Sequence, residues 1–230
     1  MDLPKINPEV AELCGIITGD GSLSKSKNGT YTIEIAGDKK EELEYLNYAS
    51  LLFKKCFNKS LKLRIEEDYA RVYARSKKIL EYFERIGLII GKKSRTARIP
   101  EIILRNKSFS LRFLRGLADS DFTFMIKNRN GKIYPQVKGC SKSGILIEQI
   151  SSILKELEIN HCTCFEKSYY RKRKKLYERH VIYINGFDNV REWFLKIGFS
   201  NSRHTEKYQQ FLRKRAGEDS NSRPKGNSIR

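Results

Sequence analysis

The sequence lacks the features of secreted and membrane-spanning proteins. It has no run of roughly 18 apolar residues and no signal-peptide pattern at its start. Histidine is scarce, with 3 residues in 230, and their spacing matches no catalytic motif. The 5 cysteines form no Cys-X-X-Cys pair, and His161 with Cys162 and Cys164 has the wrong spacing for a common zinc site. We therefore expect reduced thiols in an intracellular protein of the cytoplasm or nucleoid.

Acidic residues are far outnumbered by basic ones. The chain has 46 Lys and Arg against 27 Asp and Glu, which gives a formal charge of +19. Such a charge predicts a polyanionic partner, either nucleic acid or an anionic membrane surface. Because no segment is suited to membrane insertion, nucleic acid is favoured. The length of 230 residues allows one large domain or two subdomains of ordinary size.

One stretch of the chain occurs twice. Residues 13–21 read LCGIITGDG and residues 114–122 read LRGLADSDF. Each stretch is helix-like and places small residues four apart, on one helix face. Two such faces can pack closely, which would bring Asp20 and Asp121 side by side at the helix ends. The small residues are Gly15 with Gly19 and Gly116 with Ser120.

Two carboxylates at helix C-termini are in an unfavourable position. Each faces the negative end of a helix dipole and a nearby like charge. Bound divalent cations would resolve this conflict, and a metal held by paired carboxylates suggests phosphate chemistry. For either stretch alone, a buried helix end with a solvated acid explains the pattern equally well. The repetition favours the metal site.

Capping and periodicity predict seven elements in the first half. Asn7 and Pro8 mark a helix start, and Asp38 is predicted to cap the helix after the first hairpin. The predicted order is helix, strand, strand, helix, strand, strand, helix, over residues 8–19, 22–26, 30–35, 39–57, 60–66, 69–75 and 77–86.

The same order returns after a basic connector at residues 91–96. A short helix from residue 99 precedes elements over residues 110–120, 123–128, 132–139, 142–157, 161–168, 177–185 and 188–197. The copies also align by residue, since Gly87 and Gly198 end matching helices. A molecule made of two copies of one unit has a pseudo-two-fold axis, which suits duplex DNA.

Two LAGLIDADG-like motifs at this spacing resemble a single-chain, two-motif LAGLIDADG homing endonuclease of the archaeal type. The resemblance covers about residues 7–215 and includes the connector Gly91-Lys92-Lys93-Ser94 before Ile99-Pro100. It implies an α+β fold of two pseudo-symmetric αββαββα repeats, at residues 7–98 and 99–215. Their motif helices would form the interface, and two antiparallel sheets would form a DNA-binding saddle.

The resemblance also implies a set of site residues. Asp20 and Asp121 correspond to the metal-binding catalytic acids, and Gly19 and Ser120 would contribute to the same metal site. Roughly two or three Mg²⁺ or Mn²⁺ ions would be shared between the acids. The implied basic catalytic residues are Lys93 and Arg203, with Lys92 and His204 as competitors.

The sequence departs from the family pattern at two motif positions. Thr18 stands where many relatives have Asp, which mainly alters the capping of the helix end. Phe122 stands where Gly is expected, and a bulky side chain there can crowd the metal site or reshape the first residue of the strand. Both penultimate acids are present, so cleavage remains the leading hypothesis.

The expected function is site-specific, metal-dependent double-strand cleavage of a long intron- or insertion-site DNA target by a monomer. One alternative is a non-cleaving relative, such as an intron-splicing maturase or regulator, which Phe122 favours. A second is an RNA-binding or ribosome-associated basic protein, which explains the charge but not the paired acids.

Binding is expected from the strands, because a two-stranded ribbon fits the major groove. The candidates are Lys25, Lys27, Tyr31, Thr32, Lys62, Arg64, Arg71 and Arg75 in the first half and Lys127, Arg129, Lys132, Gln136 and Lys138 in the second. A basic loop adds Arg171, Lys172, Arg173, Lys174 and Lys175. Alone it would be a solvated tip, but beside a ribbon it predicts backbone contacts.

The chain ends predict no packed structure and no protein-splicing function. Residues 216–230 are polar and rich in turn formers, so we expect a flexible tail. The N-terminus lacks a splicing Cys or Ser and the C-terminus lacks a His-Asn end. We therefore expect a free-standing or intron-encoded enzyme.

Overall fold

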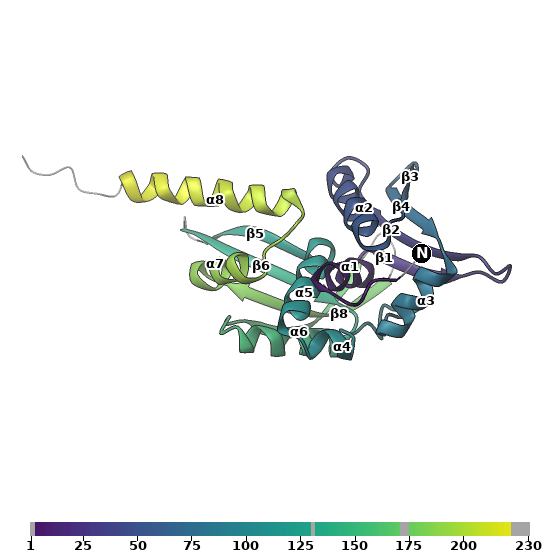
Figure 1. Cartoon of the computed structure of the whole chain (residues 1–230). Helices are drawn as coiled ribbons and strands as arrows, with labels where there is room; N and C mark the ends of the chain where they lie inside the picture. The colour runs from purple at the N-terminus through teal and green to yellow at the C-terminus, as the bar shows by residue number, and fades with distance from the viewer. Residues whose placement is uncertain (1–2, 130–131, 171–174, 222–230) are drawn as a thin grey trace, which may run out of the picture.

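The computed structural model describes residues 3–129, 132–170 and 175–221 (Figure 1). Each half of the chain forms one four-stranded sheet, with the orders β1-β2-β4-β3 and β5-β6-β8-β7. All strand pairs in both sheets are antiparallel. The identical strand orders confirm the predicted α+β fold and its internal repeat.

The elements of each half follow the predicted order. The first half contains α1 (Pro8–Thr18), β1 (Gly21–Lys25), β2 (Tyr31–Gly37), α2 (Leu43–Phe57), β3 (Lys62–Ile65), β4 (Ala70–Arg75) and α3 (Lys77–Ile86). The second contains α4 (Glu101–Leu104), α5 (Lys107–Asp121), β5 (Phe122–Arg129), β6 (Lys132–Ser141), α6 (Gly144–Glu156), β7 (Cys162–Tyr170), β8 (Lys175–Asn185), α7 (Phe187–Lys196) and α8 (Ser202–Asn221).

Helix starts agree with the prediction where a side chain caps the backbone. Asn7 accepts a hydrogen bond from the Val10 N–H at 2.9 Å, as expected for an N-cap. The start predicted at Asp38 was wrong, because the Asp38 carboxylate accepts from Lys40 and Glu41 N–H groups and forms a turn instead. As a result, α2 begins only at Leu43.

Helices α1 and α5 cross at the centre of the molecule (Figure 1). A Cβ at Gly15 would lie 2.0 Å from the Phe113 carbonyl oxygen, and one at Gly116 would lie 2.2 Å from that of Glu12. Both distances are far below a van der Waals contact. The two glycines therefore make this crossing possible, and the predicted small-residue interface is confirmed.

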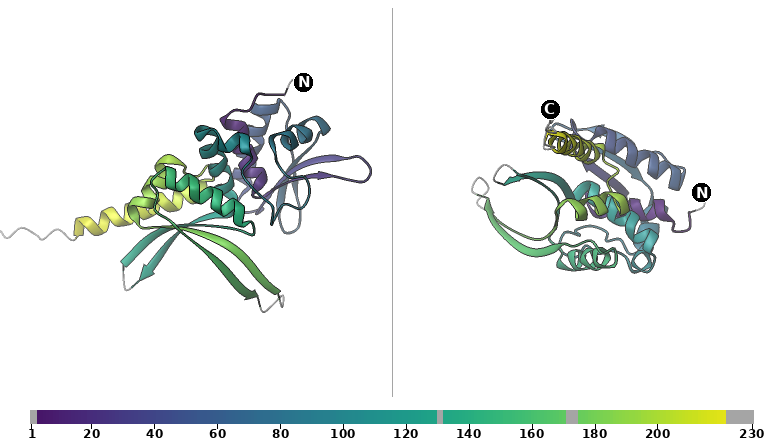
Figure 2. Two further views of the ribbon diagram at one scale, coloured as in Figure 1. Left: turned by 90° about the horizontal axis from the view of Figure 1, so that it is seen from below. Right: turned by 90° about the vertical axis from the view of Figure 1, so that its left-hand side faces the viewer.

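The helices lie on one side of the two sheets and leave the other face open (Figure 2). The sheet of the second half curls strongly, so that its two hairpins frame a concave face. Each core fills the space between a sheet and its helices, with Phe53 and Phe83 buried in the first half and Phe124 and Trp193 in the second. This arrangement corresponds to the predicted saddle.

Helix α8 links the halves and is not among the predicted helices. Its start contacts α2, because Ser202 Oγ donates to the Glu44 carboxylate at 2.8 Å. Further along, Tyr208 stacks on Phe194 with ring centroids 3.7 Å apart. The helix continues to Asn221 and so extends into the predicted tail; residues 222–230 lie outside the described range. No described helix is both long and apolar enough to cross a membrane.

Candidate metal centre and nucleic-acid interface

The two motif acids follow the central helix crossing. Asp20 stands two residues beyond α1, whereas Asp121 is the last residue of α5. The helix ends touch, since a Cβ at Gly19 would lie 1.8 Å from Ser120 Oγ. Each acid is followed directly by the first strand of its sheet. The structure thus brings Asp20, Asp121, Gly19 and Ser120 together, as the sequence predicts.

The surroundings of both acids oppose their ionisation. Burial raises the pKa of Asp121 to about 7, and the Asp20 carboxylate adds to this shift while Lys93 opposes it. Burial likewise raises the pKa of Asp20 to about 6, with a second contribution from Glu42, against Lys93 and Arg203. Asp20 lies at the mouth of the site and keeps contact with solvent, whereas Asp121 lies deeper. Protein charge alone does not compensate this acid pair.

The acid pair fits a divalent cation by its chemistry. Neither carboxylate accepts a hydrogen bond from a described residue, so its oxygens are available. Oxygen ligands are those that Mg²⁺ and Ca²⁺ prefer. The described residues contain no cluster of three or more His, Cys, Asp or Glu side chains around a possible ion. Backbone carbonyls, water and substrate would therefore have to complete the coordination.

Lys93 holds the end of α1. Its ammonium donates to the carbonyl of Gly19 at 2.9 Å and also to those of Ile17 and Gly21. Burial lowers the pKa of Lys93 to about 8, although Asp121 and Asp20 favour its charged form. The predicted placement beside the acids is correct, but the Gly19 carbonyl, a predicted metal ligand, is engaged by this ammonium.

Arg203 lies near Asp20 but is bound by other acids. Its guanidinium contacts the Glu41 carboxylate at 3.1 Å and the Glu42 carboxylate at 3.3 Å. The competitor His204 is fully buried against Phe199, and its burial lowers its pKa to about 4. Lys92 is exposed and forms no ion pair with a described residue. Lys93 and Arg203 are therefore better placed to act on the acids than their competitors, Lys92 and His204, are.

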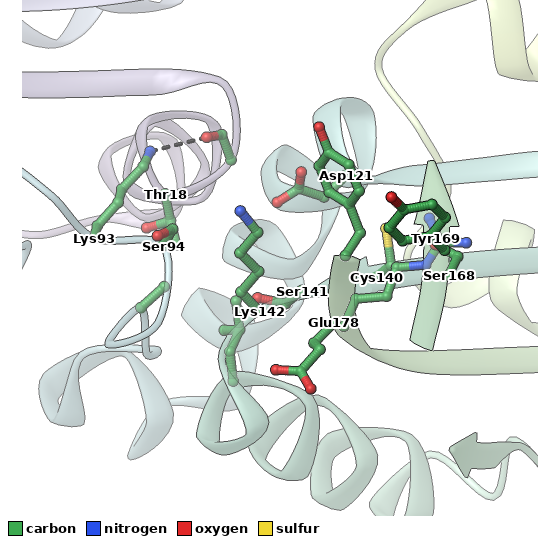
Figure 3. Close-up of a pocket in the computed structure, with 15 residues that line it drawn as sticks. Thr18, Lys93, Ser94, Asp121, Cys140, Ser141, Lys142, Ser168, Tyr169 and Glu178 are labelled. Carbon is green, nitrogen blue, oxygen red and sulfur yellow. Dashed lines mark hydrogen bonds between the residues drawn. The ribbon is translucent and has the colours of Figure 1, made fainter. Parts of the chain in front are cut away.

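A cavity of about 710 Å³ opens beside Asp121 (Figure 3). Lys93, Lys142 and Arg179 line it, together with residues of β7 and β8. The Lys142 side chain points into this space on the side of Asp121 (Figure 3). Lys142 and Arg179 are absent from the sequence-based site. Aligning the repeats would have placed Lys142 two residues before α6, at the position that Glu41 occupies before α2 in the first half.

Phe122 does not crowd the acids, contrary to one expectation from its size. The ring is 2% exposed and stacks on Trp193 with centroids 5.3 Å apart. Opposite Phe122 in the sheet stands Gly139, where a Cβ would lie 2.3 Å from the ring. The missing side chain of Gly139 makes room for the ring, which turns into the core of the second half.

A family model described as a LAGLIDADG-like domain matches residues 108–198, the second repeat of this fold. The solved structure of I-DmoI with DNA and Mn has the same fold, with a TM-score of 0.57, 17% identity, and coverage of 83% of this chain and 96% of that chain. The chain thus has the fold of a two-motif LAGLIDADG protein. The LAGLIDADG homing endonuclease I-GzeII with its DNA target gives a TM-score of 0.58 at 13% identity, covering 96% of this chain and 94% of that chain.

Relatives by sequence come from Methanocaldococcus jannaschii. The Replication factor C small subunit is 27% identical over 215 residues, which are 90% of this chain and 10% of that protein. An uncharacterised protein is 24% identical over 167 residues, which are 71% of this chain and 60% of that protein. The chain therefore spans less than two thirds of the length of either relative.

Strand register decides which predicted DNA contacts share the open face of the saddle. In the first half, Thr32 pairs with Arg75 and Arg64 pairs with Arg71 across neighbouring strands. These residues lie on the face of the sheet that faces away from the core, whereas Ile33 points into the core. In the second half, Phe124 points into the core, so Lys127 and Lys138 lie on the other, open face of the sheet. The predicted residues on the open face are Thr32, Lys62, Arg64, Arg71, Arg75, Lys127 and Lys138.

Some of the predicted contacts are placed elsewhere. Lys25 pairs with Tyr31 on the helix-covered side of the sheet, where the Lys25 ammonium lies over the Tyr31 ring. Lys27 stands in the hairpin turn. Gln136 faces the open side but is only 5% exposed and is hydrogen-bonded to Asn185. These departures follow from the two-residue period of strands, in which successive side chains point to opposite faces of the sheet. The presence of a basic residue in the sequence does not tell which face it occupies.

Carboxylates also stand on the open face. Arg71 is paired with Glu34 at 2.7 Å and with Glu66 at 2.9 Å. Glu166 accepts from Tyr183, Arg179 and Lys138, and these bonds lower its pKa to about 2. Two predicted cations, Arg71 and Lys138, are therefore partly neutralised within the protein.

The remaining predicted contacts lie outside the described part of the chain. Arg171, Lys172, Arg173 and Lys174 belong to residues 171–174, which the structure leaves out. For Arg129, Lys132 and Lys175 the structure describes the strand but not the side chain. Their predicted contacts with DNA stay predictions.

Proposed function

We propose that this chain is a metal-dependent, site-specific DNA endonuclease that cuts both strands of a long target at an intron or insertion site. The observation that carries the proposal is the meeting of Asp20 and Asp121 at the point where both open sheets begin. A single duplex lying along the saddle would pass directly over this acid pair. One monomer would address both strands through its two halves.

Different residues of the chain would bind the DNA, hold the metal ions and stabilise charge at the reacting phosphate. Exposed cations of the open face, such as Lys62, Arg64 and Arg75, would bind phosphates and hold the duplex. Asp20 and Asp121, with the carbonyl of Ser120, would hold Mg²⁺ or Mn²⁺, and the Gly19 carbonyl would take part only by sharing or giving up its bond from Lys93. When bound, these ions supply charge neutralisation at phosphorus and an activated water. Lys93 would place a positive charge beside the reacting phosphate.

Similar structures support the choice of partner and ion. I-DmoI was solved with DNA and Mn and with DNA and Ca, and I-GzeII with a DNA target. The pair of available carboxylates in this chain supports the same ion class.

The test uses a plasmid that carries the uninterrupted form of the locus encoding the chain. In Mg²⁺, the wild type should linearise this plasmid, whereas Asp20→Asn and Asp121→Asn should bind it and leave it uncut. No cutting by the wild type, with DNA affinity intact, would contradict the nuclease. Cutting that persists in both variants would contradict the site.

A non-cleaving relative is the alternative function. Phe122 favours it on sequence grounds, because a large residue beside Asp121 can block a metal. With the ring buried against Trp193, this argument no longer applies. The plasmid experiment also addresses this alternative, since a binder without cleavage would retain affinity in all three proteins.

A further inference from the structure

The two acids have oppositely charged surroundings, although their halves share one topology. Helices α2 and α6 occupy the same place in each half, directly after the second strand. The residue before each helix is Glu42 in the first half and Ser143 in the second. One residue earlier stand Glu41 and Lys142. A pair of carboxylates in the first half thus corresponds to a hydroxyl and an ammonium in the second.

On the Asp121 side, the described lining of the cavity holds three cations and, besides Asp121, one carboxylate, that of Glu178, which is paired with Lys167 at 3.1 Å. Lys93, Lys142 and Arg179 face this space, and Lys142 makes no hydrogen bond or ion pair with any residue that the structure describes (Figure 3). Arg179 forms an ion pair with Glu166, at 2.8 Å between Nη2 and Oε2. A phosphate entering the cavity would therefore meet at least one unpaired positive charge at Lys142.

On the Asp20 side, negative charge dominates. Glu42 is 9% exposed and its carboxylate is fixed by the Asp38 N–H at 2.8 Å. Glu42 also lies close enough to Asp20 for its charge to act on that carboxylate. Lys93 acts on both acids and so does not distinguish the two sides, whereas Arg203, which acts on Asp20, is bound by both Glu41 and Glu42. A phosphate at Asp20 would meet repulsion from Glu42 and a cation that is already paired.

We infer that the two strands of the target are cut in a fixed order, first at the phosphate beside Asp121 and second at the phosphate beside Asp20. The inference rests on the proposed function. Negative charge that develops in the transition state is stabilised by unpaired cations and destabilised by a fixed carboxylate. In each strand one water adds across one P–O bond and yields a phosphate terminus and a hydroxyl terminus. Because both strands undergo the same reaction, the different charges around Asp121 and Asp20 would set the difference between the two cleavage rates.

The test follows each strand of a cleavable duplex with a different end label under single-turnover conditions. The wild type should accumulate a nicked duplex, cut in one strand only. Lys142→Met should slow the faster strand by roughly ten- to a hundred-fold and leave the slower strand nearly unchanged. Glu42→Gln, which keeps an oxygen for the Asp38 N–H, should accelerate the slower strand only.

Glu44→Gln is the matched control, because Glu44 belongs to the same helix but binds Ser202 on the surface; its strand ratio should equal that of the wild type. Equal rates for both strands in the wild type would overturn the inference while leaving the nuclease intact. So would Lys142→Met and Glu42→Gln variants that alter both strands alike. Cutting of neither strand would instead contradict the proposed function on which the inference rests.

Discussion

The two halves of the molecule share a backbone plan and differ in the side chains around it. Both contain a motif helix, an acid, a four-stranded sheet and covering helices in the same order. Matching motif positions nevertheless hold Gly21 and Phe122, or Thr18 and Asp119. The acids and the close helix crossing are common to both halves, whereas the residues next to them serve one half only.

Thr18 and Asp119 show this divergence most clearly. Thr18 donates to the Cys14 carbonyl at 2.7 Å within its own helix. Asp119 instead accepts from the N–H groups of Ser200 and Asn201 at 2.8 and 2.9 Å, although burial raises its pKa to about 7. Asp119 thus fixes the segment that leads to Arg203, a connection that the first half does not have at Thr18.

The largest expected difference between the halves concerns their basic residues. Lys93→Met should slow cleavage by roughly a hundred-fold, because the Lys93 ammonium interacts with both acids. Arg203→Met should cost roughly ten-fold or less, because Arg203 is bound by Glu41 and Glu42. Single-turnover rates at saturating protein would measure both. A larger loss for Arg203→Met would contradict the assignment.

The second comparison concerns stability at Phe122. Phe122→Ala should destabilise the protein by about 3–5 kcal/mol, because a buried aromatic ring is lost. Gly139→Ala should also destabilise it, by about 1–3 kcal/mol, since the new Cβ meets that ring. In the Phe122→Ala background, Gly139→Ala should cost little. Urea unfolding of the double-mutant cycle measures this coupling, and additive effects would refute it.

The sequence predicts the elements that depend on short-range signals. The Asn7 cap, the glycine that ends α3 and the two motif faces are all written in local patterns. Helix α8 escapes prediction because its apolar residues Tyr208 and Phe211 gain meaning only against Phe124, far away in the chain. Contacts between residues far apart in the chain produce no pattern in the local sequence from which the helix could be predicted.

The candidate site divides in the same way. The positions of Asp20 and Asp121 follow from the repeat, because each acid stands at or just beyond the end of a motif helix and the two motif helices cross at the pseudo-two-fold axis. The pairing of Arg203 with Glu41, and the approach of Lys142 to Asp121, depend on how loops fold onto the helix ends. Side-chain partners across such distances are set by tertiary structure, so residue type and spacing do not reveal them.

The third prediction concerns pH and the metal-free protein. The pKa values of Asp20 and Asp121 are raised to about 6 and about 7, so the folded state holds their protons more tightly than the unfolded state does. Their stabilising contribution is complete below the unfolded pKa of about 4 and is lost as the pH rises through 6 to 7.

Thermal unfolding in a chelating buffer measures this effect. From about pH 4 to about pH 8, the wild type should lose more stability than the Asp20→Asn, Asp121→Asn double variant. Adding Mg²⁺ at the higher pH should raise the unfolding temperature of the wild type and not that of the variant. Parallel pH profiles for the two proteins would refute the raised pKa values.

The smallest expected effect distinguishes the two faces of the first sheet. Arg75→Gln should reduce the slope of log affinity against log salt by about 0.9, because an exposed cation on the open face would lose one phosphate contact. Lys25→Gln, on the helix-covered side, should leave the slope unchanged. Equal changes in both variants would contradict the orientation of the duplex in the saddle.

The central claim is that the acids of both halves form one metal centre, and localised oxidation tests it most directly. Fe²⁺ bound in place of Mg²⁺, with ascorbate and peroxide, cuts a polypeptide next to the ion. With duplex DNA present, the wild type should be cut around residues 19–21 and 120–122, and excess Mg²⁺ should suppress both cuts. Asp20→Asn and Asp121→Asn should each weaken both cuts. Cuts confined to one segment, or unchanged in the two variants, would contradict a shared centre.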